Sequence, residues 1–515
     1  MDADLAVLQF DQPPHKRQTE ANPSLRSVEA LGTLHEEIEY ARQVLGGDAL
    51  AVVTDLQQGL ARALVGPYID VNGHLRCLRT VGYDSGFGTM PNSKTLRTLT
   101  LPMTTSPPTD SNAGESAWRV LLVTLAIQAM VSMAVLAIPA MAPAMARSLG
   151  VSATLTGGYV ALVYIGAIVA SLMAAQCVAR YGAIRVSQFG LLLCALGLAI
   201  SALPSVAAVA LGALLIGLGY GPITPASSHL LVVSTPPHRA ALIFSIKQTG
   251  VPLGGMLAGA IVPSIVLAGG IGGALFLVAL ACIACALLSQ SLRHAHDADR
   301  RPNAPLAMRS LVGPLALVFS QRALARLAAF SFVFSAVQLC LAAYLVTHLH
   351  ETLGYSLVAA GLALTVAQAG GVVGRIIWGY VADRFLGARR TLAMLAALMA
   401  LGTAGTALLR AGTPMPMVLL LVAAFGASAT GWNGIYLAEV ARLAPSGMAG
   451  AATGGALSVT FFGVVLGPAL FGAISGFFGS YSAGYLALAI PTVLCCCGLL
   501  VGGRGGPGTK AWPVA

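Results

Sequence analysis

The sequence GYVADRFLGARR, residues 379–390, joins two long apolar segments and has a counterpart earlier in the chain. At an offset of 204 residues, AAQCVARYG (174–182) aligns with WGYVADRFL (378–386), so that Arg180 matches Arg384. The alignment continues upstream without a gap, where SLGVSATLTGGYV (148–160) matches TLGYSLVAAGLAL (352–364). The chain therefore contains an internal duplication.

A second repeated pair lies further along each half. GVPLGGMLAGAI (250–261) matches GVVLGPALFGAI (463–474) at an offset of 213 residues. Small residues at four-residue spacing allow membrane helices to pack closely, so we interpret these glycines as structural. A duplicated membrane unit is typical of transporters whose two halves move about a central site.

Composition separates the chain into two parts. Of 515 residues, 57% are hydrophobic and only 9% are charged, whereas a soluble protein carries about a quarter charged residues. Before residue 117 there are 14 acidic residues and 9 Lys and Arg; after it there are 5 and 20. Only the second part has the composition of a membrane protein.

Twelve apolar runs of about 20 residues follow Trp118, the length at which a helix crosses hydrocarbon. The sequence predicts an all-α integral membrane protein with these spans: 118–141, 154–176, 186–204, 206–230, 241–267, 271–291, 325–347, 356–380, 390–409, 415–437, 448–475 and 481–502. The fourth and fifth, rich in Gly and Pro, have the least certain boundaries.

The cations segregate to one side of the predicted membrane. With the amino terminus in the cytoplasm, the external segments hold only Arg147 and Arg410. The cytoplasmic segments hold Arg119, Arg180, Arg185, Arg239, Arg293, Arg300, Arg301, Arg309, Arg322, Arg326, Arg384, Arg389, Arg390, Arg442, Arg504 and Lys510. This asymmetry predicts a multi-pass protein of the bacterial cytoplasmic membrane with both termini inside, and it accounts for the basic charge without a nucleic-acid partner.

The predicted organisation has five parts. Residues 1–116 are predicted to be a cytoplasmic segment that is either disordered or, before Met103, the product of an over-extended gene model whose true start is Met103. A small regulatory domain is the alternative. A six-helix bundle over 117–291, a cytoplasmic loop over 292–324, a second six-helix bundle over 325–505 and a tail over 506–515 follow. The loop contains RHAHDADRR (293–301), which we interpret as a solvated linker in preference to a metal site.

GYVADRFLGARR resembles the loop signature G-x-x-x-D-R-x-G-R-R of the major facilitator superfamily, with Leu386 as one extra residue. The matching residues are Gly379, Asp383, Arg384, Gly387, Arg389 and Arg390. The first half keeps Arg180 and Gly182 but has Ala175 and Ala179 where the family has Gly and Asp. The resemblance implies two pseudo-symmetric bundles and a loop that latches one conformation without binding substrate. We expect Gly379 to allow a close helix contact and Asp383 to accept hydrogen bonds at a helix end or to pair with an arginine.

Two cations lie inside predicted spans, Lys247 in the fifth and Arg375 in the eighth. A charge in hydrocarbon costs about 2.5–3.5 kcal/mol on insertion scales and is functional by default. Their repeat-related positions, Thr460 and Ser171, are uncharged. In monocarboxylate transporters, another branch of the superfamily, an arginine at the place of Arg375 contacts the substrate carboxylate. The pair therefore predicts an anion site.

Other interpretations of these two cations stay open. Both side chains are long enough to reach the interface, and Arg375 can pair with Asp383 or Glu439. The aspartate that monocarboxylate transporters place one turn earlier is Gly371 here, which puts proton coupling by that route in doubt.

Further candidates for substrate binding are polar or indole side chains within the spans. In the family the first, fourth, seventh and tenth spans line the cavity. We select Gln128, Gln248, Gln338, Gln368, Trp432 and Asn433, with Tyr164 and Tyr220 as weaker candidates. A helix–helix hydrogen bond is the alternative role for each.

The expected function is secondary transport of a small organic anion, such as a monocarboxylate or aromatic acid, by symport or uniport, with a proton as the candidate coupling ion. Export of a drug or other amphiphile and a transporter-like sensor are the alternatives. The fourth span lacks the arginine that many family members carry there. Drug/proton antiporters of the family often place a carboxylate in their first or fourth span, and its absence here argues against that alternative. We expect no enzyme activity, cofactor or metal, and a monomer in the lipid bilayer.

Overall fold

The computed structural model describes residues 68–69, 75–76, 110–234, 243, 246–297, 300–303, 306, 312–445 and 448–501. The chain divides into two units, Met1–Thr104 and Thr105–Ala515. In the first, strands β1 (Tyr68–Ile69) and β2 (Leu75–Arg76) pair antiparallel. The prediction for residues 1–116 otherwise lies almost entirely outside the described residues, as does the tail over 506–515.

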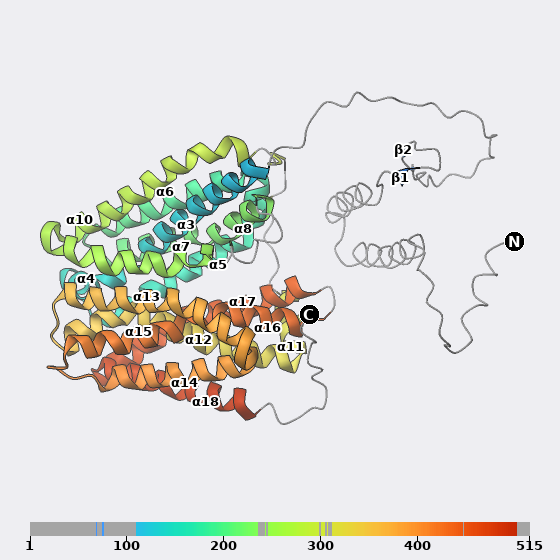
Figure 1. Ribbon diagram of the computed structural model, residues 1–515. Coiled ribbons are helices and arrows are strands. Elements are labelled where there is room, and N and C mark those ends of the chain that lie inside the picture. Colours follow the sequence, from blue (N-terminus) through green and yellow to red (C-terminus); the bar gives the residue numbers. More distant parts are fainter. Residues whose placement is uncertain are drawn as a thin grey trace, which may run out of the picture. The chain divides into compact units, whose positions relative to one another are not determined.

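The second unit is helical throughout its described residues (Figure 1). Short helical turns, Ala153–Leu155, His348–Thr352 and Ala382–Leu386, adjoin the longer helices. The α-helices are α3 (Asp110–Ala140), α4 (Ala142–Leu149), α5 (Thr156–Tyr181), α6 (Ala183–Ser201), α7 (Val206–Tyr220), α8 (Ile223–Ser234), α10 (Gly250–His296), α11 (Val312–Ser320), α12 (Arg322–Thr347), α13 (Leu357–Val381), α14 (Gly387–Leu408), α15 (Met415–Gly431), α16 (Asn433–Leu443), α17 (Ala449–Phe478) and α18 (Tyr481–Val501).

Ten helical segments among the described residues are long and apolar enough to cross a membrane. Two of them, Ile246–Arg293 and Leu357–Leu408, have 48 and 52 residues, more than twice the length that one crossing needs. The backbone breaks inside each, at Gly270 (φ 71°, ψ 178°) and at Gly387 (φ 74°). Each therefore crosses twice, and the total is the twelve crossings that the sequence predicts.

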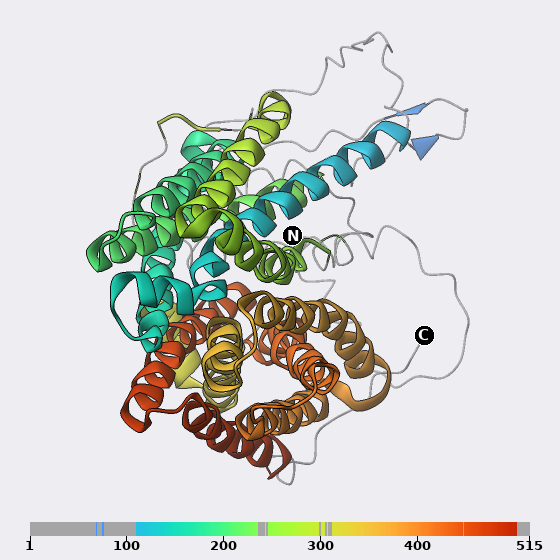
Figure 2. The same ribbon diagram turned by 90° about the vertical axis from the view of Figure 1, so that its left-hand side faces the viewer.

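The helices form two groups of six crossings. Figure 1 and Figure 2 show α3 to α10 gathered in one bundle and α11 to α18 in the other, side by side. Large apolar side chains cover the outer surface; Leu288 is 76% exposed and Phe477 is 84% exposed. Such an apolar surface is stable only in an apolar environment, and the hydrocarbon of a lipid bilayer provides one.

The repeated glycines bring equivalent helices together in the two halves. A Cβ atom at Gly254 of α10 would lie 2.3 Å from the carbonyl oxygen of Ala129 in α3. At the equivalent Gly467 of α17 it would lie 2.5 Å from the Cβ of Ala336 in α12. Any larger residue would push these helices apart, so the predicted packing role of the repeat is confirmed.

Helices enter the predicted loop 292–324 from both sides. α10 extends to His296, and α11 occupies Val312–Ser320. α11 packs against α17, where a Cβ at Gly455 would lie 2.1 Å from the carbonyl oxygen of Pro314. The apolar sequence VGPLALVFS is helical here because Val318 is buried against the bundle.

Candidate functional site

A small cavity with polar groups among apolar walls lies between the two bundles. Its volume is about 30 Å³, close to the space of one water molecule. The first bundle contributes Ser132, Val135, Leu136, Tyr164, Tyr220 and Val251, and the second contributes Gln338, Leu339, Ala342 and Gln368. The rings of Tyr164 and Tyr220 meet edge to face, with centroids 5.8 Å apart. Two of the predicted glutamines thus share a cavity with the two tyrosines.

Lys247 is buried just before α10. Its side chain is 1% exposed, and within the described residues Nζ has no hydrogen-bond partner. Arg375 lies close enough for the two positive charges to repel each other. An ammonium group that is both buried and unpaired is costly, and the expectation that it reaches water at the interface is wrong for this conformation.

Arg375 of α13 links the two bundles. Its Nη1 donates a hydrogen bond to the carbonyl oxygen of Gln248 in the first bundle, and its Nε donates to the carbonyl oxygen of Thr430, 3.2 Å away. Among the described residues Arg375 forms no ion pair with Asp383 or Glu439. Glu439 pairs instead with Arg442, at 2.5 Å. Within the described part of the chain, the guanidinium charge therefore has no carboxylate partner in this conformation.

Gln128 is fully buried in α3. Its Oε1 accepts a hydrogen bond from Thr224 Oγ1 at 3.3 Å, while Nε2 lacks a partner within the described chain. One helical turn later on the same face, Ser132 lines the cavity, and its hydroxyl is likewise unpaired there. An unused donor in the lining of a cavity, as Ser132 has, suits a polar ligand.

The remaining candidates differ in their surroundings. Asn433 Nδ2 donates to Gln338 Oε1 at 3.3 Å, so two predicted residues bind each other beside the cavity. Gln368 lies against Gly255 of the other bundle, where an added Cβ would be 2.0 Å from its Nε2. Trp432 is fully buried and its Nε1 donates to the carbonyl oxygen of Ala429 at 3.0 Å. Trp432 therefore packs inside the second bundle.

Tyr344 of α12 forms hydrogen bonds to the other bundle. Its hydroxyl accepts a hydrogen bond from the backbone N–H of Gly157, 2.7 Å away in the other bundle. The carbonyl oxygens of Thr154 and Pro468 lie at 2.7 Å and 3.0 Å as acceptors for the same hydroxyl. A single side chain thus joins α5, α12 and α17.

The loop motif of the second half is largely exposed. Asp383, Arg384 and Arg390 are exposed, and Arg389 Nε donates to the carbonyl oxygen of Leu499 at 2.7 Å. The close helix contact expected at Gly379 is wrong, because a Cβ there would have no neighbour within 4 Å.

The close contacts of α13 lie one to two turns earlier than Gly379. At Gly374 an added Cβ would be 2.2 Å from the carbonyl oxygen of Ala427.

In the corresponding loop of the first half, a residue from far along the chain accepts hydrogen bonds from the backbone. Asp297 is 6% exposed, and its carboxylate accepts hydrogen bonds from the backbone N–H groups of Ile184 (2.9 Å) and Arg185 (3.1 Å). Gly182, with φ 93°, begins the turn. Arg180 lies at the end of α5 with its guanidinium 5.5 Å from the ring centre of Tyr181.

Comparison with known proteins agrees with this architecture. Residues 120–468 match the family model of the Major Facilitator Superfamily, which is more than half of the chain. The chain belongs to the major facilitator superfamily. It is therefore a secondary transporter by family, and it is not an enzyme.

Several solved members of the superfamily share the fold of this transporter. The nucleoside transporter NupG matches 75% of the chain and 100% of its own length, with a TM-score of 0.63 and 17% identity. A D-xylose-proton symporter matches 75% of the chain and 97% of its own length, with a TM-score of 0.59 and 17% identity. At this identity the likeness shows the fold alone.

A curated relative is similar over a shorter stretch. The benzoate transport protein of Acinetobacter baylyi is 30% identical over 141 residues, which is 27% of this transporter. The match spans 29% of that protein's length.

Two structural residues of the transporter escaped the sequence analysis. Ser132 is a cavity residue, and its four-residue spacing from Gln128 was the available signal. The interpretation of residues 293–301 as a solvated linker is wrong for Asp297, which is buried. The available signal there was Gly182, which precedes α6 but has no side chain to cap it.

Proposed function

We propose that this transporter carries a small organic anion and that Lys247 and Arg375 bind its carboxylate. The observation that carries the proposal is the buried ammonium group of Lys247, which has no hydrogen-bond partner within the described chain. Removing an ion from water costs several kcal/mol unless a counter-charge compensates. Arg375 adds a second positive charge and no compensation. An anionic substrate supplies the missing negative charge.

The lining of the central cavity favours a monocarboxylate with an apolar or aromatic body. Tyr164 and Tyr220 offer ring edges and faces, and Gln338 and Gln368 offer amide groups. A few directed polar groups among apolar walls are typical of sites for small organic molecules. The partial similarity to a benzoate transport protein supports the same class.

Substrate entry requires the bundles to separate. A cavity of about 30 Å³ is far smaller than an organic acid. Tyr344 and Arg375 both bond across the bundles, and rocking of the halves would break such contacts on alternate sides. We therefore propose alternating access by a monomer. We also propose that it lies in the cytoplasmic membrane of a bacterium with both termini inside, which the distribution of arginines supports.

The proposal is tested by uptake into proteoliposomes that contain the purified full-length protein. The panel is benzoate, lactate, uridine, xylose and a cationic dye, each with and without an inward proton gradient. We expect uptake of at least one carboxylate and little of the neutral or cationic solutes. Stimulation by the proton gradient would support symport, and its absence uniport.

Variants connect the substrate to the site. Lys247→Gln and Arg375→Gln should each reduce carboxylate uptake by about tenfold or more, since a hydrogen bond to a charged group contributes about 1.5–3 kcal/mol. Arg410→Gln is the matched control, because Arg410 is exposed and distant in sequence from the cavity residues. Preferred transport of the cationic dye, or unchanged carboxylate uptake in the double variant, would contradict the proposal.

A further inference from the structure

A second and larger cavity lies inside the C-terminal bundle, away from the residues that line the central cavity. Its volume is about 190 Å³. It is at the end of the bundle where α12 and α14 begin and where α16 and α18 finish. Its lining contains three arginines and one acidic residue, Arg326, Arg389, Arg442 and Glu439, among apolar side chains such as Leu327 and Phe330.

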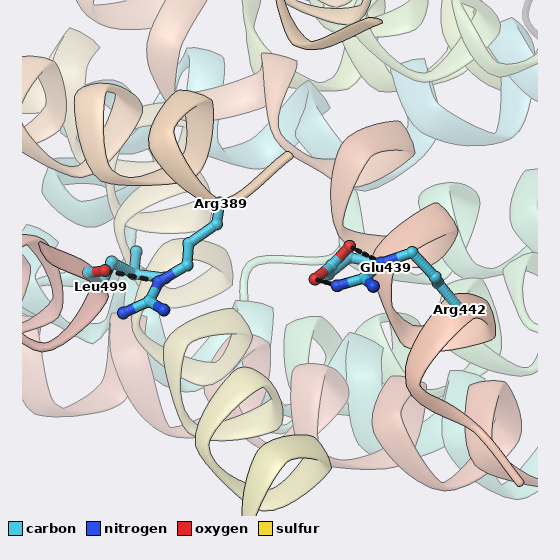
Figure 3. Close-up of polar contacts among 4 residues, drawn as sticks. All are labelled: Arg389, Glu439, Arg442 and Leu499. Carbon is cyan, nitrogen blue, oxygen red and sulfur yellow. Dashed lines mark hydrogen bonds and ion pairs between the residues drawn. The ribbon is translucent and has the colours of Figure 1, made fainter. Parts of the chain in front are cut away.

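Most hydrogen-bond donors of the three arginines have no partner among the residues that the structure describes; Figure 3 shows the contacts of Arg389 and Arg442. Arg389 uses Nε for the carbonyl oxygen of Leu499, 2.7 Å away. Arg442 donates from Nε and Nη2 to the two carboxylate oxygens of Glu439, at 2.8 Å and 2.5 Å. Arg326 donates from Nε to the carbonyl oxygen of Arg322 at 3.3 Å. A guanidinium group has five N–H donors, so several remain for a ligand.

The charge of the cavity lining is unbalanced. Glu439 neutralises one guanidinium, which leaves an excess of two positive charges on the lining. Arg326 and Arg442 are exposed, so the attraction for an anion is that of a partly solvated site and weakens as salt rises. A free phosphate near neutral pH carries up to two negative charges, and the phosphodiester of a lipid headgroup carries one, so either would neutralise part or all of this excess.

We propose that this cavity binds a phosphate group. Guanidinium groups match phosphate oxygens with paired, charge-assisted hydrogen bonds, and Arg326 and Arg389 have the free donors for them. Basic pockets between membrane helices on the cytoplasmic side are known sites for lipid headgroups. The phosphate comes either from such a headgroup or from a free phosphate in solution; both present anionic phosphate oxygens to the guanidinium groups, the headgroup with one negative charge and free phosphate with up to two.

A bound phosphate would connect three helices that meet at this end of the bundle. Arg326 is on α12, Arg389 on α14 and Arg442 on α16. The expected consequence is stabilisation of the folded bundle by the ligand, because a molecule that binds only the native state raises its stability. The prediction is independent of the substrate of the central cavity.

The test is thermal unfolding of the purified full-length protein in a neutral detergent. Inorganic phosphate is titrated at constant ionic strength against chloride. In a separate arm, phosphatidylglycerol is added and compared with phosphatidylcholine. A rise in melting temperature with phosphate and with the anionic lipid, or with either one, supports the site and identifies the source. No rise with either ligand beyond its chloride or phosphatidylcholine control overturns it.

Two kinds of variant, expected to weaken and to strengthen phosphate binding, make the test specific. Arg326→Gln and Arg389→Gln should each weaken phosphate binding by about tenfold or more. Glu439→Gln should strengthen it, because the change removes the one negative charge and releases the donors of Arg442. Arg410→Gln, with the same change of charge on an exposed residue, should leave binding unchanged.

Two outcomes of the variant series would overturn the proposal. One is equal phosphate affinity in the wild type and in both arginine variants. The other is weaker binding in Glu439→Gln, which would mean that the pair with Arg442 only holds the bundle together. If Arg389→Gln fails to fold, Arg326→Gln decides the question, since Arg326 is exposed and its one hydrogen bond is within its own helix.

Discussion

The carboxylate of Asp297 caps helix α6 through the backbone N–H of Ile184, 2.9 Å away, although 113 residues separate the two in sequence. The next amide, that of Arg185, binds the same carboxylate at 3.1 Å. These are the second and third amides of the helix, which a side chain at its first boundary residue normally satisfies. That boundary residue is Gly182, which has no side chain. Asp297 therefore ties the end of α10 to the loop between α5 and α6.

Asp297→Ala should destabilise the protein by about 1–2 kcal/mol, the usual value of a helix cap, because two buried amides lose their acceptor. The measurement is chemical or thermal unfolding in detergent. Asp383→Ala is the control: Asp383 is the exposed aspartate of the second-half loop, and its loss should change stability by less than about 0.5 kcal/mol. Equal losses of stability in the two variants would show that the cap of α6 contributes no more than an exposed aspartate does.

Gly182→Ala should destabilise the protein by about 1–3 kcal/mol. Gly182 has φ 93°, where residues with a Cβ atom are strained, and the added Cβ would lie 2.3 Å from Cγ of Asp297. Gly379→Ala tests the opposite case, because Gly379 is helical and has open space around its Cα. There alanine should be neutral or stabilising by up to about 1 kcal/mol. Comparison of the two melting temperatures checks the sign of each.

Lys247→Met should raise the stability of the substrate-free protein by about 1–3 kcal/mol while it abolishes anion transport. Methionine has a similar shape and removes a buried ammonium group that has no partner among the described residues. Unfolding without substrate measures the first effect, and carboxylate uptake measures the second. A variant that is less stable but transports normally would assign Lys247 a structural role.

Tyr344→Phe should loosen the contact between the bundles near Gly157. The substitution removes the acceptor of the Gly157 amide and the donor to Thr154 or Pro468, at a net value of about 1 kcal/mol per hydrogen bond. We expect roughly fivefold faster hydrogen exchange at the start of α5. Exchange in α14, which Tyr344 does not contact through these bonds, is the internal reference. Unchanged protection of residues 154–160 would contradict the assignment of Tyr344 as a contact that holds the two bundles together.

Much of the fold was predictable because lipid simplifies the problem. Backbone groups in hydrocarbon must be satisfied within each segment, so every long apolar run becomes a helix. The predicted break between 267 and 271 falls at Gly270, and that between 380 and 390 contains Gly387. The helix α11 inside the predicted central loop was not foreseen, because nine apolar residues are too few to cross a membrane and only contact with α17 makes them helical.

The candidate site was predictable only residue by residue. Lys247 and Arg375 were recognisable because charge is rare in apolar segments, and the repeat showed that neither has a charged counterpart. Their partners were not recognisable. Asn433 and Gln338, which bind each other, are 95 residues apart, and the neighbouring Trp432 belongs to the core of one bundle.

The sequence by itself determined twelve crossings, a duplicated architecture, the superfamily and the presence of two cations in the membrane region. Tertiary structure alone decided which polar groups meet: that Arg375 bonds across to Gln248, that Lys247 is left without a partner among the described residues, and that Asp297 caps α6. The physical reason is that a membrane helix is apolar on nearly all faces. Its sequence therefore reveals that it spans the membrane but carries little signal about its rotation, which is set by close packing of small residues against neighbouring helices.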